Sequence, residues 1–576
     1  MSRLGDYFDD RIGFRRRTRE MLEHPIAGSP SWARSMGFTL LFLLCAETVT
    51  GVALMTTYAP SIEAAWASVH FTTYIAPHGW LLRGLHRFSG EAMLVLACAH
   101  VAMLAMGEAH RRPREVGYVA ALLAVGVIAA ACVTGAVLPW DQQGYWARRV
   151  ELGITAMGPG GSAIVRLVQG GSELGQLALT RMYALHVIVL PLVCAGLFRL
   201  RRRSEWTFGD KISARHNTGY ESYYPRQLAR DLALAMSVTL LVGWMTYKVH
   251  GAPLDAPADP SSDYTARPEW YFMWLYELRR RMPAPLEFWG TLGVPGALFV
   301  LFGALPWVDK RPHGVSRIGV VLVLVSFATI GPLGYMAMDR DAHDAKYAEA
   351  HQVAAKRARI AVDLAMHGVP PGGPLVMLRD DPDLRGEALF VQHCASCHVL
   401  GELGDKKKAT APLLDGWGQE AWIRAMLHDP DGDDRFGRTP YKEQMPSMDV
   451  PPKDNTGDFK PMSTEDMTAV AKFLSSQGDD ATLTSVGENV VKDRCTVCHL
   501  FKGEGDDNAQ GLAPELAGYG SFDWIRAQIG DPSSKATYRE NALDPKMKHH
   551  MPRFAGEIPA SDIDVLARWV KRRVRT

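Results

Sequence analysis

Long apolar runs are concentrated in residues 1–340, whereas residues 341–576 have the mixed composition of an ordinary soluble chain. A helix needs about 20 apolar residues to span a bilayer. Seven runs are long enough, near residues 34–56, 80–105, 116–138, 180–199, 228–246, 287–307 and 316–337. The pattern predicts an all-α protein that begins with a seven-helix transmembrane bundle.

The Lys and Arg residues predict the orientation of this bundle. Residues 1–33 carry six of them, and others cluster after the second, fourth and sixth runs, whereas residues 57–78 carry none. Positive charge in short loops favours the cytoplasmic side. We therefore expect a cytoplasmic N-terminus in a bacterial inner membrane, with the first run kept as an anchor rather than cleaved as a leader. Seven spans then place the C-terminal part on the periplasmic side.

The soluble part contains the sequence C-x-x-C-H twice. This is the attachment sequence of c-type haem, in which the cysteines form thioethers and the histidine is an axial ligand of the iron. Zinc binding is the alternative, but neither copy has a second ligand pair at zinc spacing. Two covalently bound haem c groups are thus predicted, at Cys394, Cys397 and His398 and at Cys495, Cys498 and His499.

An internal repeat surrounds the two motifs. Ala411-Pro412 matches Ala513-Pro514, and Trp422-Ile-Arg-Ala matches Trp524-Ile-Arg-Ala, at an offset of about one hundred residues, as for the motifs. Each copy ends in a predicted amphipathic helix, near 464–476 and 560–572, and a helical Ala-rich linker over 340–380 precedes the first copy. The repeat predicts two small helical domains in tandem.

Each c-type haem needs a sixth ligand, commonly a methionine on a loop well after the motif. Met445 and Met551 both precede a proline in a polar loop, which is a poor position for a core methionine. They are therefore the predicted ligands, one in each tandem domain. Met448 and Met547 are nearby alternatives.

Composition and the other cysteines add little chemistry. The net charge of +1 gives no reason to expect a nucleic-acid partner. Four of the eight cysteines stand singly in apolar runs and are interpreted as small buried hydrophobic residues, at Cys45, Cys98, Cys132 and Cys194. No disulfide framework is predicted.

Two histidines lie in the second apolar run. His86 and His100 are fourteen residues apart, so a helix places both side chains on one face, about 21 Å apart along the axis. Ionisable residues within a span are costly and usually functional. The spacing can offer one ligand to each of two haems, one near each membrane surface.

Five further motifs carry a family resemblance. They are Gly79-Trp-Leu-Leu-Arg83-Gly-Leu-His86-Arg87, Arg112-Pro-Arg-Glu115, Val133-Thr-Gly-Ala-Val-Leu-Pro-Trp140, Thr180-Arg-Met-Tyr-Ala-Leu-His186 and Pro268-Glu269-Trp270-Tyr271. With them, residues 30–338 resemble the cytochrome b of Rieske/cytochrome b (bc-type) complexes, and the first four helices are most similar to the chloroplast type. The C-terminal repeats resemble class I cytochromes c.

The resemblance implies a domain order along the chain. We expect a cytoplasmic segment over 1–33, a four-helix cytochrome b core over 34–225, a three-helix part over 226–340, a linker over 341–380, and cytochrome c domains over 381–480 and 481–576.

The resemblance also implies ligands for haem b. His86 and His186 would hold the low-potential haem b near the periplasmic face, and His100 would bind a second haem near the cytoplasmic face. Arg83 resembles the arginine that pairs with a haem propionate. Only glycine leaves room for a haem edge against a helix, a role implied for Gly37, Gly51 and Gly135.

Quinone sites follow from the same resemblance. The resemblance implies that Glu269 and Tyr271 are residues of the quinol-oxidation site. Glu269 would accept a proton there, since a carboxylate in an apolar pocket is suited to this task. Asp231 resembles the acidic residue of the quinone-reduction site, although an Asp at a helix start is also an ordinary cap.

The sequence departs from the family pattern at the second haem. Its other ligand would come fourteen or fifteen residues after His186, where this chain has Leu200 and Arg201, and Ala121 replaces a glycine that faces the same haem. Arginine stays protonated and is a poor iron ligand. The site of His100 therefore holds either a differently ligated haem or none. Ser35 replaces the cysteine that tethers an extra haem in the chloroplast type.

Together these features predict a quinol–cytochrome c oxidoreductase subunit. The chain has no Cys-x-His with an accompanying Cys-x-x-His, so a Rieske iron–sulfur protein is expected as a partner, besides quinol, membrane lipid, a downstream cytochrome or oxidase, and a second copy in a homodimer. The alternative is a non-bifurcating electron conduit between the quinone pool and periplasmic carriers.

Overall fold

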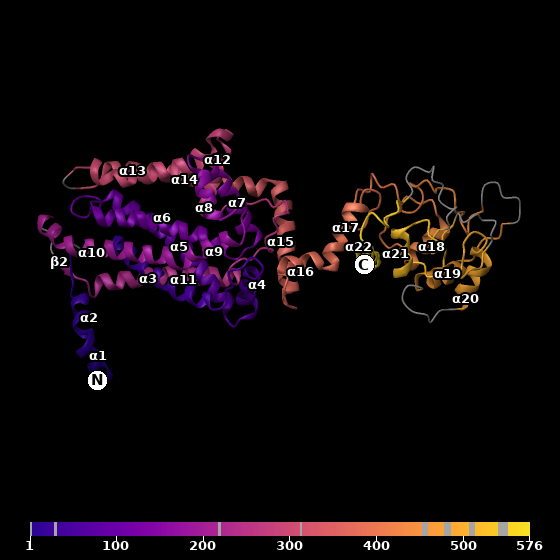
Figure 1. Ribbon diagram of the computed structural model, residues 1–576, viewed down its shortest axis with the longest axis horizontal. Helices are drawn as coiled ribbons and strands as arrows, with labels where there is room; N and C mark the ends of the chain where they lie inside the picture. The colour runs from indigo at the N-terminus through magenta and orange to yellow at the C-terminus, as the bar shows by residue number, and fades with distance from the viewer. Residues whose placement is uncertain are drawn as a thin grey trace. The chain divides into compact units, whose positions relative to one another are not determined.

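The computed structural model describes residues 3–27, 31–216, 220–311, 314–451, 459–476, 485–505, 513–538 and 551–575, and it is mostly helical (Figure 1). The chain divides into two compact units, Met1–Met377 and Leu378–Thr576. The first unit contains the apolar runs and the linker, and the second contains both C-x-x-C-H motifs. The predicted all-α fold is confirmed.

Seven helical segments in the described residues are long and apolar enough to cross a membrane, which confirms the predicted spans. Five are single helices, and the fourth and sixth contain π-helical turns. They are α3 (Trp32–Met55), α5 (Gly79–Met106), α6 (Glu115–Val137), the series α9 (Gln176–Ala184), η2 (Leu185–Val189) and α10 (Leu190–His216), then α11 (Arg226–Val249), the series η4 (Ala284–Leu286), η5 (Trp289–Gly293) and α13 (Val294–Val308), and α14 (Arg317–His343).

Shorter elements connect these spans. A two-stranded antiparallel sheet pairs Ile26 with Glu221 and so joins the segment before α3 to the segment before α11. The remaining elements of the first unit are α1 (Arg3–Ile12), α2 (Phe14–Leu22), β1 (Pro25–Ala27), α4 (Ala65–His70), η1 (Phe71–Ile75), α7 (Gln142–Ala156), α8 (Gly161–Gln169), β2 (Tyr220–Ser222), η3 (Trp270–Phe272), α12 (Met273–Arg280), α15 (Ala345–Ala365) and α16 (Pro374–Asp380).

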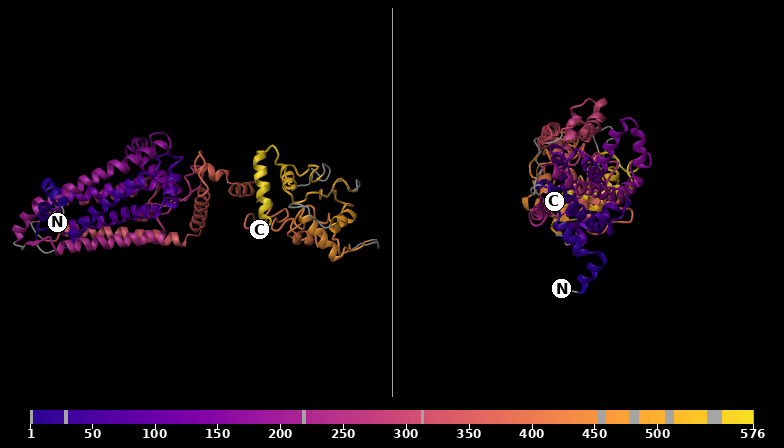
Figure 2. Two further views of the ribbon diagram at one scale, coloured as in Figure 1. Left: turned by 90° about the horizontal axis from the view of Figure 1, so that it is seen from below. Right: turned by 90° about the vertical axis from the view of Figure 1, so that its left-hand side faces the viewer.

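The long helices run side by side in the first unit (Figures 1 and 2). α5 packs against α3, α6, α11 and α14, and α6 packs against α10. Large apolar side chains remain exposed on the outer helices, such as Val49, Leu240 and Phe327. An apolar outer surface is what a bundle needs when lipid rather than water surrounds it.

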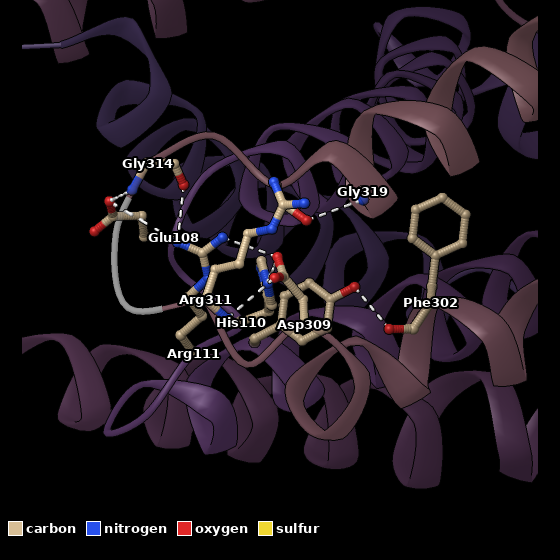
Figure 3. A network of polar contacts seen from close by, with 10 residues as sticks. Glu108, His110, Arg111, Phe302, Asp309, Arg311, Gly314 and Gly319 are labelled. Atoms are coloured by element: carbon tan, nitrogen blue, oxygen red, sulfur yellow. Dashed lines mark hydrogen bonds and ion pairs between the residues drawn. The ribbon is translucent and has the colours of Figure 1, made fainter.

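A buried polar network joins the loop after α5 to the loop after α13 (Figure 3). Asp309 Oδ2 accepts hydrogen bonds from Arg111 Nη2 at 2.8 Å and from His110 Nε2 at 3.1 Å, and Arg111 Nη1 donates to the Gly314 carbonyl at 2.8 Å. Burial raises the pKa of Asp309, but hydrogen bonds from Ser316, Arg111 and His110 outweigh it and hold that pKa below its ordinary value. The network fixes α13 and α14 against α5 and α6.

The second unit contains α17 (Pro382–His393), α18 (Glu420–His428), α19 (Thr464–Ser476), α20 (Ser485–Val490), η6 (Val491–Cys495), α21 (Phe522–Gly530) and α22 (Ala560–Arg573). The predicted C-terminal helices of the repeats correspond to α19 and α22. α17 packs against α22, as Figure 1 shows, and α19 packs against α20.

The cores of the second unit do not follow the order of the repeats. One core combines Phe390 and Cys394 with Trp524, Leu566 and Trp569. The other combines helices α18 and α19 with Cys495 and Phe501. Each core thus takes its motif from one repeat and its C-terminal helix from the other. This packing differs from the expected pair of self-contained domains that meet between residues 480 and 481.

Candidate functional site

His86 and His186 face each other inside the first unit. His86 lies on α5 and His186 lies in the π-helical turn η2, a type of turn that is frequent at functional sites. Their ring centroids are 6.1 Å apart and the rings are inclined by 79°. A metal–imidazole bond of about 2 Å on each side brings two ring centroids to roughly this separation.

The outer nitrogen of each ring is held by the protein. His86 Nδ1 lies 2.9 Å from Glu47 Oε2 and 2.9 Å from Thr50 Oγ1. His186 Nδ1 lies 3.0 Å from the Ala131 carbonyl oxygen and 3.2 Å from Thr134 Oγ1. Such bonds orient a ligating histidine and set its tautomer. They leave Nε2 of each ring as the nitrogen available to iron.

Three glycines lie directly against the histidines. A Cβ at Gly135 would be 2.7 Å from His186 Cε1, and a Cβ at Gly51 would be 3.2 Å from His86 Cε1. A Cβ at Gly37 would be 3.8 Å from the His100 ring. The ring of His186 in its present position therefore requires glycine at 135. The contact with a Cβ would be looser at Gly51 and loosest at Gly37.

His100 lines a cavity of about 220 Å³. It is 2% exposed, and neither ring nitrogen has a hydrogen-bond partner. Buried polar atoms without partners cost free energy unless a ligand satisfies them. The cavity also carries a net positive charge, since its lining includes Arg34, Arg114 and Arg201 against Glu108 and Glu205. An imidazole beside arginines fits a haem iron with its propionates.

Among the residues that the structure describes, no second histidine lines this cavity. Arg201 Nη2 donates to Glu205 Oε1 at 2.6 Å, and the Ser204 hydroxyl is buried without a partner. Ala121 is buried in a core with Val101 and Leu305. The described residues beside His100 thus include an arginine, Arg201, whereas a second histidine, His186, faces His86.

Glu269 lies in the loop between α11 and η3 and contacts α5. Its Oε2 accepts a hydrogen bond from Arg87 Nη2 at 2.7 Å, and Arg87 Nε donates to Glu91 Oε1 at 3.0 Å. Trp270 Nε1 donates to Glu91 Oε2 at 2.9 Å. The Pro-Glu-Trp-Tyr loop is thereby fastened to the helix that carries His86.

Glu269 also lines a small cavity with Val133, Gly144, Arg148 and Glu151. Burial raises the pKa of Glu269, Arg87 opposes that rise, and the nearby Glu91 and Asp141 add to it. Burial likewise raises the pKa of Tyr271, which packs near Met93 and Cys194. A raised pKa makes a carboxylate a stronger base, which suits Glu269 to accept a proton.

Two other predicted site residues make protein contacts in the structure. Arg83 donates to the carbonyl oxygens of Ala252 and Pro253, both at 2.6 Å, and so ties α5 to the loop after α11. Asp231 accepts hydrogen bonds from Tyr223 and Gln227, both at 2.7 Å. Asp231 does not line the cavity beside His100, so the structure does not bring these two residues into one site.

The two C-x-x-C-H motifs have closely similar geometry. His398 Nδ1 lies 2.9 Å from the Pro412 carbonyl oxygen, and His499 Nδ1 lies 2.9 Å from the Pro514 carbonyl oxygen. Burial lowers the pKa of both histidines, and the backbone hydrogen bonds oppose this. A neutral imidazole with its Nδ1–H held by a carbonyl presents Nε2 to a metal.

Each predicted methionine ligand packs with the C-x-x-C-H motif of the other repeat and not with the motif that precedes it in its own repeat. Met551 packs against the core that contains Cys394, and Met445 and Met448 pack against the core that contains Cys495. The alternative Met547 lies outside the described residues. The assignment of each methionine to the haem motif that precedes it along the chain therefore disagrees with the packing.

Sequence reasoning missed the residues that orient the candidate ligands. Glu47, Thr50 and Thr134 hold the two histidines, and Arg87 holds Glu269. Glu47, Arg87 and Glu91 carry the one available signal, since charged residues are rare in a membrane span. Threonine in an apolar helix carries no comparable signal.

Family models match cytochrome b/b6/petB over residues 23–201, cytochrome b(C-terminal)/b6/petD over 257–348, and cytochrome c over 384–478. Cytochrome b6 of Chlamydomonas reinhardtii is 34% identical over 201 residues, which are 34% of this chain and 91% of that protein. Cytochrome b6 of Synechococcus elongatus is 33% identical over 196 residues, again 34% of this chain and 91% of the relative.

A solved structure described as a hyperthermophilic respiratory Complex III has the same fold. Its TM-score is 0.52 at 23% identity, and the match covers 62% of this chain and 97% of the other. Seven apolar helices make the chain a multi-pass membrane protein, and its cytochrome b and cytochrome c domains imply haem b and haem c. The chain belongs to the cytochrome b/b6 family of cytochrome bc oxidoreductases and carries a cytochrome c domain at its C-terminal end.

Proposed function

We propose that the chain is the membrane core of a quinol–cytochrome c oxidoreductase, with a dihaem cytochrome c attached to it. The observation that carries the proposal is the link from Glu269 through Arg87 to its neighbour His86 on α5. A candidate proton acceptor and a candidate haem ligand are thus held by the same turn of helix. Quinol oxidation requires this proximity, because a proton and an electron leave the same molecule.

Each residue has a distinct task in this proposal. His86 and His186 hold the low-potential haem b, which supplies one-electron transfer when bound. Glu269 accepts a proton from the quinol hydroxyl, with Tyr271 beside it, and releases the proton to the periplasm. Arg87 keeps the carboxylate oriented before that transfer.

Oxidation of one quinol to quinone releases two electrons and two protons. A partner Rieske iron–sulfur protein would accept one electron and pass it to the haems that His398 and His499 would hold, and the haem that His86 and His186 would hold would accept the other. The missing iron–sulfur ligands and the family relationship support this partner. A downstream cytochrome or oxidase, membrane lipid and a second copy in a homodimer complete the proposed set of partners.

The proposal includes a second haem b, which His100 would bind. The cationic cavity and the unpaired imidazole support a haem whose sixth ligand is not a histidine. The same departure favours a second candidate function, a non-bifurcating conduit between the quinone pool and periplasmic carriers. That function would need neither a cytoplasmic quinone site nor Asp231.

The proposed orientation places the N-terminus in the cytoplasm and both C-x-x-C-H motifs in the periplasm of a bacterial inner membrane. The distribution of Lys and Arg supports it. Protease added to intact spheroplasts should release a haem-stained fragment from residues 378–576, whereas protection of these residues would contradict the orientation.

Copurification tests the function itself. A tagged full-length chain, solubilised in mild detergent, should bring with it a [2Fe–2S] protein with a Rieske electron paramagnetic resonance signal, and the complex should reduce cytochrome c with quinol. A chain that oxidises quinol without an iron–sulfur partner would favour the non-bifurcating conduit.

A further inference from the structure

Both cores of the second unit combine parts of the two sequence repeats. The first motif, at Cys394, packs with α21, α22 and Met551 from the second repeat. The second motif, at Cys495, packs with α18, α19 and Met445 from the first repeat. The exchange is reciprocal, so neither repeat retains a complete core of its own.

Close helix contacts hold α17 to α22. A Cβ at Gly386 would overlap the Trp569 side chain, so only glycine permits this approach. The rings of Phe390 and Trp569 have centroids 5.4 Å apart. Arg385 Nη2 is also paired with Asp562 Oδ1. A small residue, an aromatic ring and an ion pair therefore all join the first helix of one repeat to the last helix of the other.

The second core repeats this arrangement with equivalent residues. A Cβ at Gly487 would overlap the Ala469 carbonyl and lie 2.6 Å from Phe473 Cβ. Phe473 also contacts Phe501, with ring centroids 5.7 Å apart. Gly487 and Phe473 occupy in their repeats the positions of Gly386 and Trp569. The two cores thus exchange their C-terminal helices in the same way, with equivalent residues at the two contacts.

The two chain segments cross at a cluster of aromatic rings. Trp417 packs against both cores, as does Tyr519, the equivalent residue of the second repeat. Their ring centroids are 5.2 Å apart, and Trp417 and Trp524 are 5.7 Å apart. Each crossing residue is flanked by glycines with positive φ between 67° and 73°, at Gly416 and Gly418 and at Gly518 and Gly520.

These observations lead to one conclusion about haem ligation. We propose that the c-type haems are ligated across the repeats, His398 with Met551 and His499 with Met445 or its neighbour Met448. The proposal rests on haem binding by the two motifs and is independent of quinol oxidation. Each haem site is then incomplete in a single repeat, and the dihaem part is one intertwined unit rather than two separable domains.

Helix pairing can be tested by cross-linking in the full-length chain. Asp466 of α19 occupies the position of Asp562 in α22, so it is the partner that Arg385 would meet if each repeat folded by itself. The variants are Arg385→Cys with Asp562→Cys and, as the matched control, Arg385→Cys with Asp466→Cys. A short bis-maleimide is added to the haem-loaded membrane protein, and linked peptides are identified by mass spectrometry.

We expect an intramolecular 385–562 link and at least tenfold less 385–466 link. A dominant 385–466 link, or a 385–562 link that joins two chains, would overturn the proposal. The four cysteines of the two C-x-x-C-H motifs are bonded to haem and so do not react with the bis-maleimide. Variants that carry only one of the introduced cysteines control for links to the other thiols of the chain.

Ligand identity gives a second readout that does not depend on cross-linking. In full-length chain carrying Cys495→Ser and Cys498→Ser, the haem at His398 is the only c-type haem that remains. Met551→Leu should then abolish the methionine–iron charge-transfer band and lower the haem potential, whereas Met445→Leu should leave both unchanged. The reverse pattern would show ligation within each repeat. If these chains with one c-type haem fail to accumulate, the cross-linking result decides.

Discussion

The guanidinium of Arg87 lies 2.7 Å from the carboxylate of Glu269, although 182 residues separate them. Arg87 is the neighbour of His86, and the same guanidinium also reaches Glu91. A proton acceptor that is paired with an arginine on the haem-bearing helix has a fixed orientation and a defined electrostatic partner.

Glu269→Gln keeps the shape of the side chain and removes the base. Quinol-dependent reduction of the c-type haems should slow by about 10²-fold, within the usual effect of a general base. Stopped-flow absorbance of the purified complex measures this rate. Asp263→Asn, an exposed carboxylate in the same loop, is the control and should leave the rate unchanged. Equal rates in wild type and Glu269→Gln would make Glu269 structural.

The pH dependence of the same reaction follows from the raised pKa of Glu269. The carboxylate accepts a proton only above its pKa, so the rate should fall as pH decreases through that raised value. The acid limb should therefore lie above the ordinary range for glutamate, near 4.3, and should vanish in Glu269→Gln. A limb that persists in this variant belongs to another group.

Gly135→Val places a branched side chain where a Cβ is already 2.7 Å from His186. The imidazole must move, and the haem between His86 and His186 should be lost. Pyridine haemochrome analysis should show the ratio of haem b to haem c fall while haem c stays constant. Gly196→Val is the control, because a Cβ there meets nothing within 4 Å. Retention of all haem b in Gly135→Val would contradict the ligand assignment.

In the described part of the chain, the cavity beside His100 is lined by Arg201 and by no second histidine. We expect low-temperature electron paramagnetic resonance to show a single low-spin bis-histidine haem b signal, from His86 and His186. Any haem at His100 should give a different signal. Two bis-histidine b signals in the purified chain would require a ligand from elsewhere and would refute the altered site.

Asp309→Asn removes a buried charge that pairs with Arg111 and His110. Leaving a buried arginine without its partner costs about 3–5 kcal/mol, so the membrane unit should unfold at a lower temperature. Glu287→Gln, which breaks a half-exposed pair with Arg279 at 3.6 Å, should cost about 0–1 kcal/mol. Thermal unfolding monitored by circular dichroism compares the two variants.

The sign of the pH effect follows from the depressed pKa of Asp309. Its stabilisation is present above the unfolded pKa, near 3.9, and is lost as pH falls through the lower folded value. The difference between wild type and Asp309→Asn should be constant from pH 7 to 5 and should shrink below about 4. A difference that grows on acidification would contradict this account.

Local sequence patterns predicted much of the molecule. Apolar run length placed all seven spans within a few residues, because a bilayer imposes one length on every helix. The polar contacts were not predictable, since nothing in the sequence links Arg87 to Glu269 or Arg111 to Asp309. The pairing of α17 with α22 also escaped prediction. By sequence alone, Gly386 could pack equally well against Phe473 or Trp569. The repeat favoured Phe473, because it lies in the same repeat as Gly386.

Rapid reduction by quinol tests the central claim most directly. Purified chain is mixed with quinol, with and without its iron–sulfur protein, and the b- and c-type haems are followed separately. A bifurcating oxidoreductase should reduce the haem between His86 and His186 and the haems at His398 and His499 together, and only when the iron–sulfur protein is present. Reduction of the c-type haems at the same rate without that protein would contradict the account.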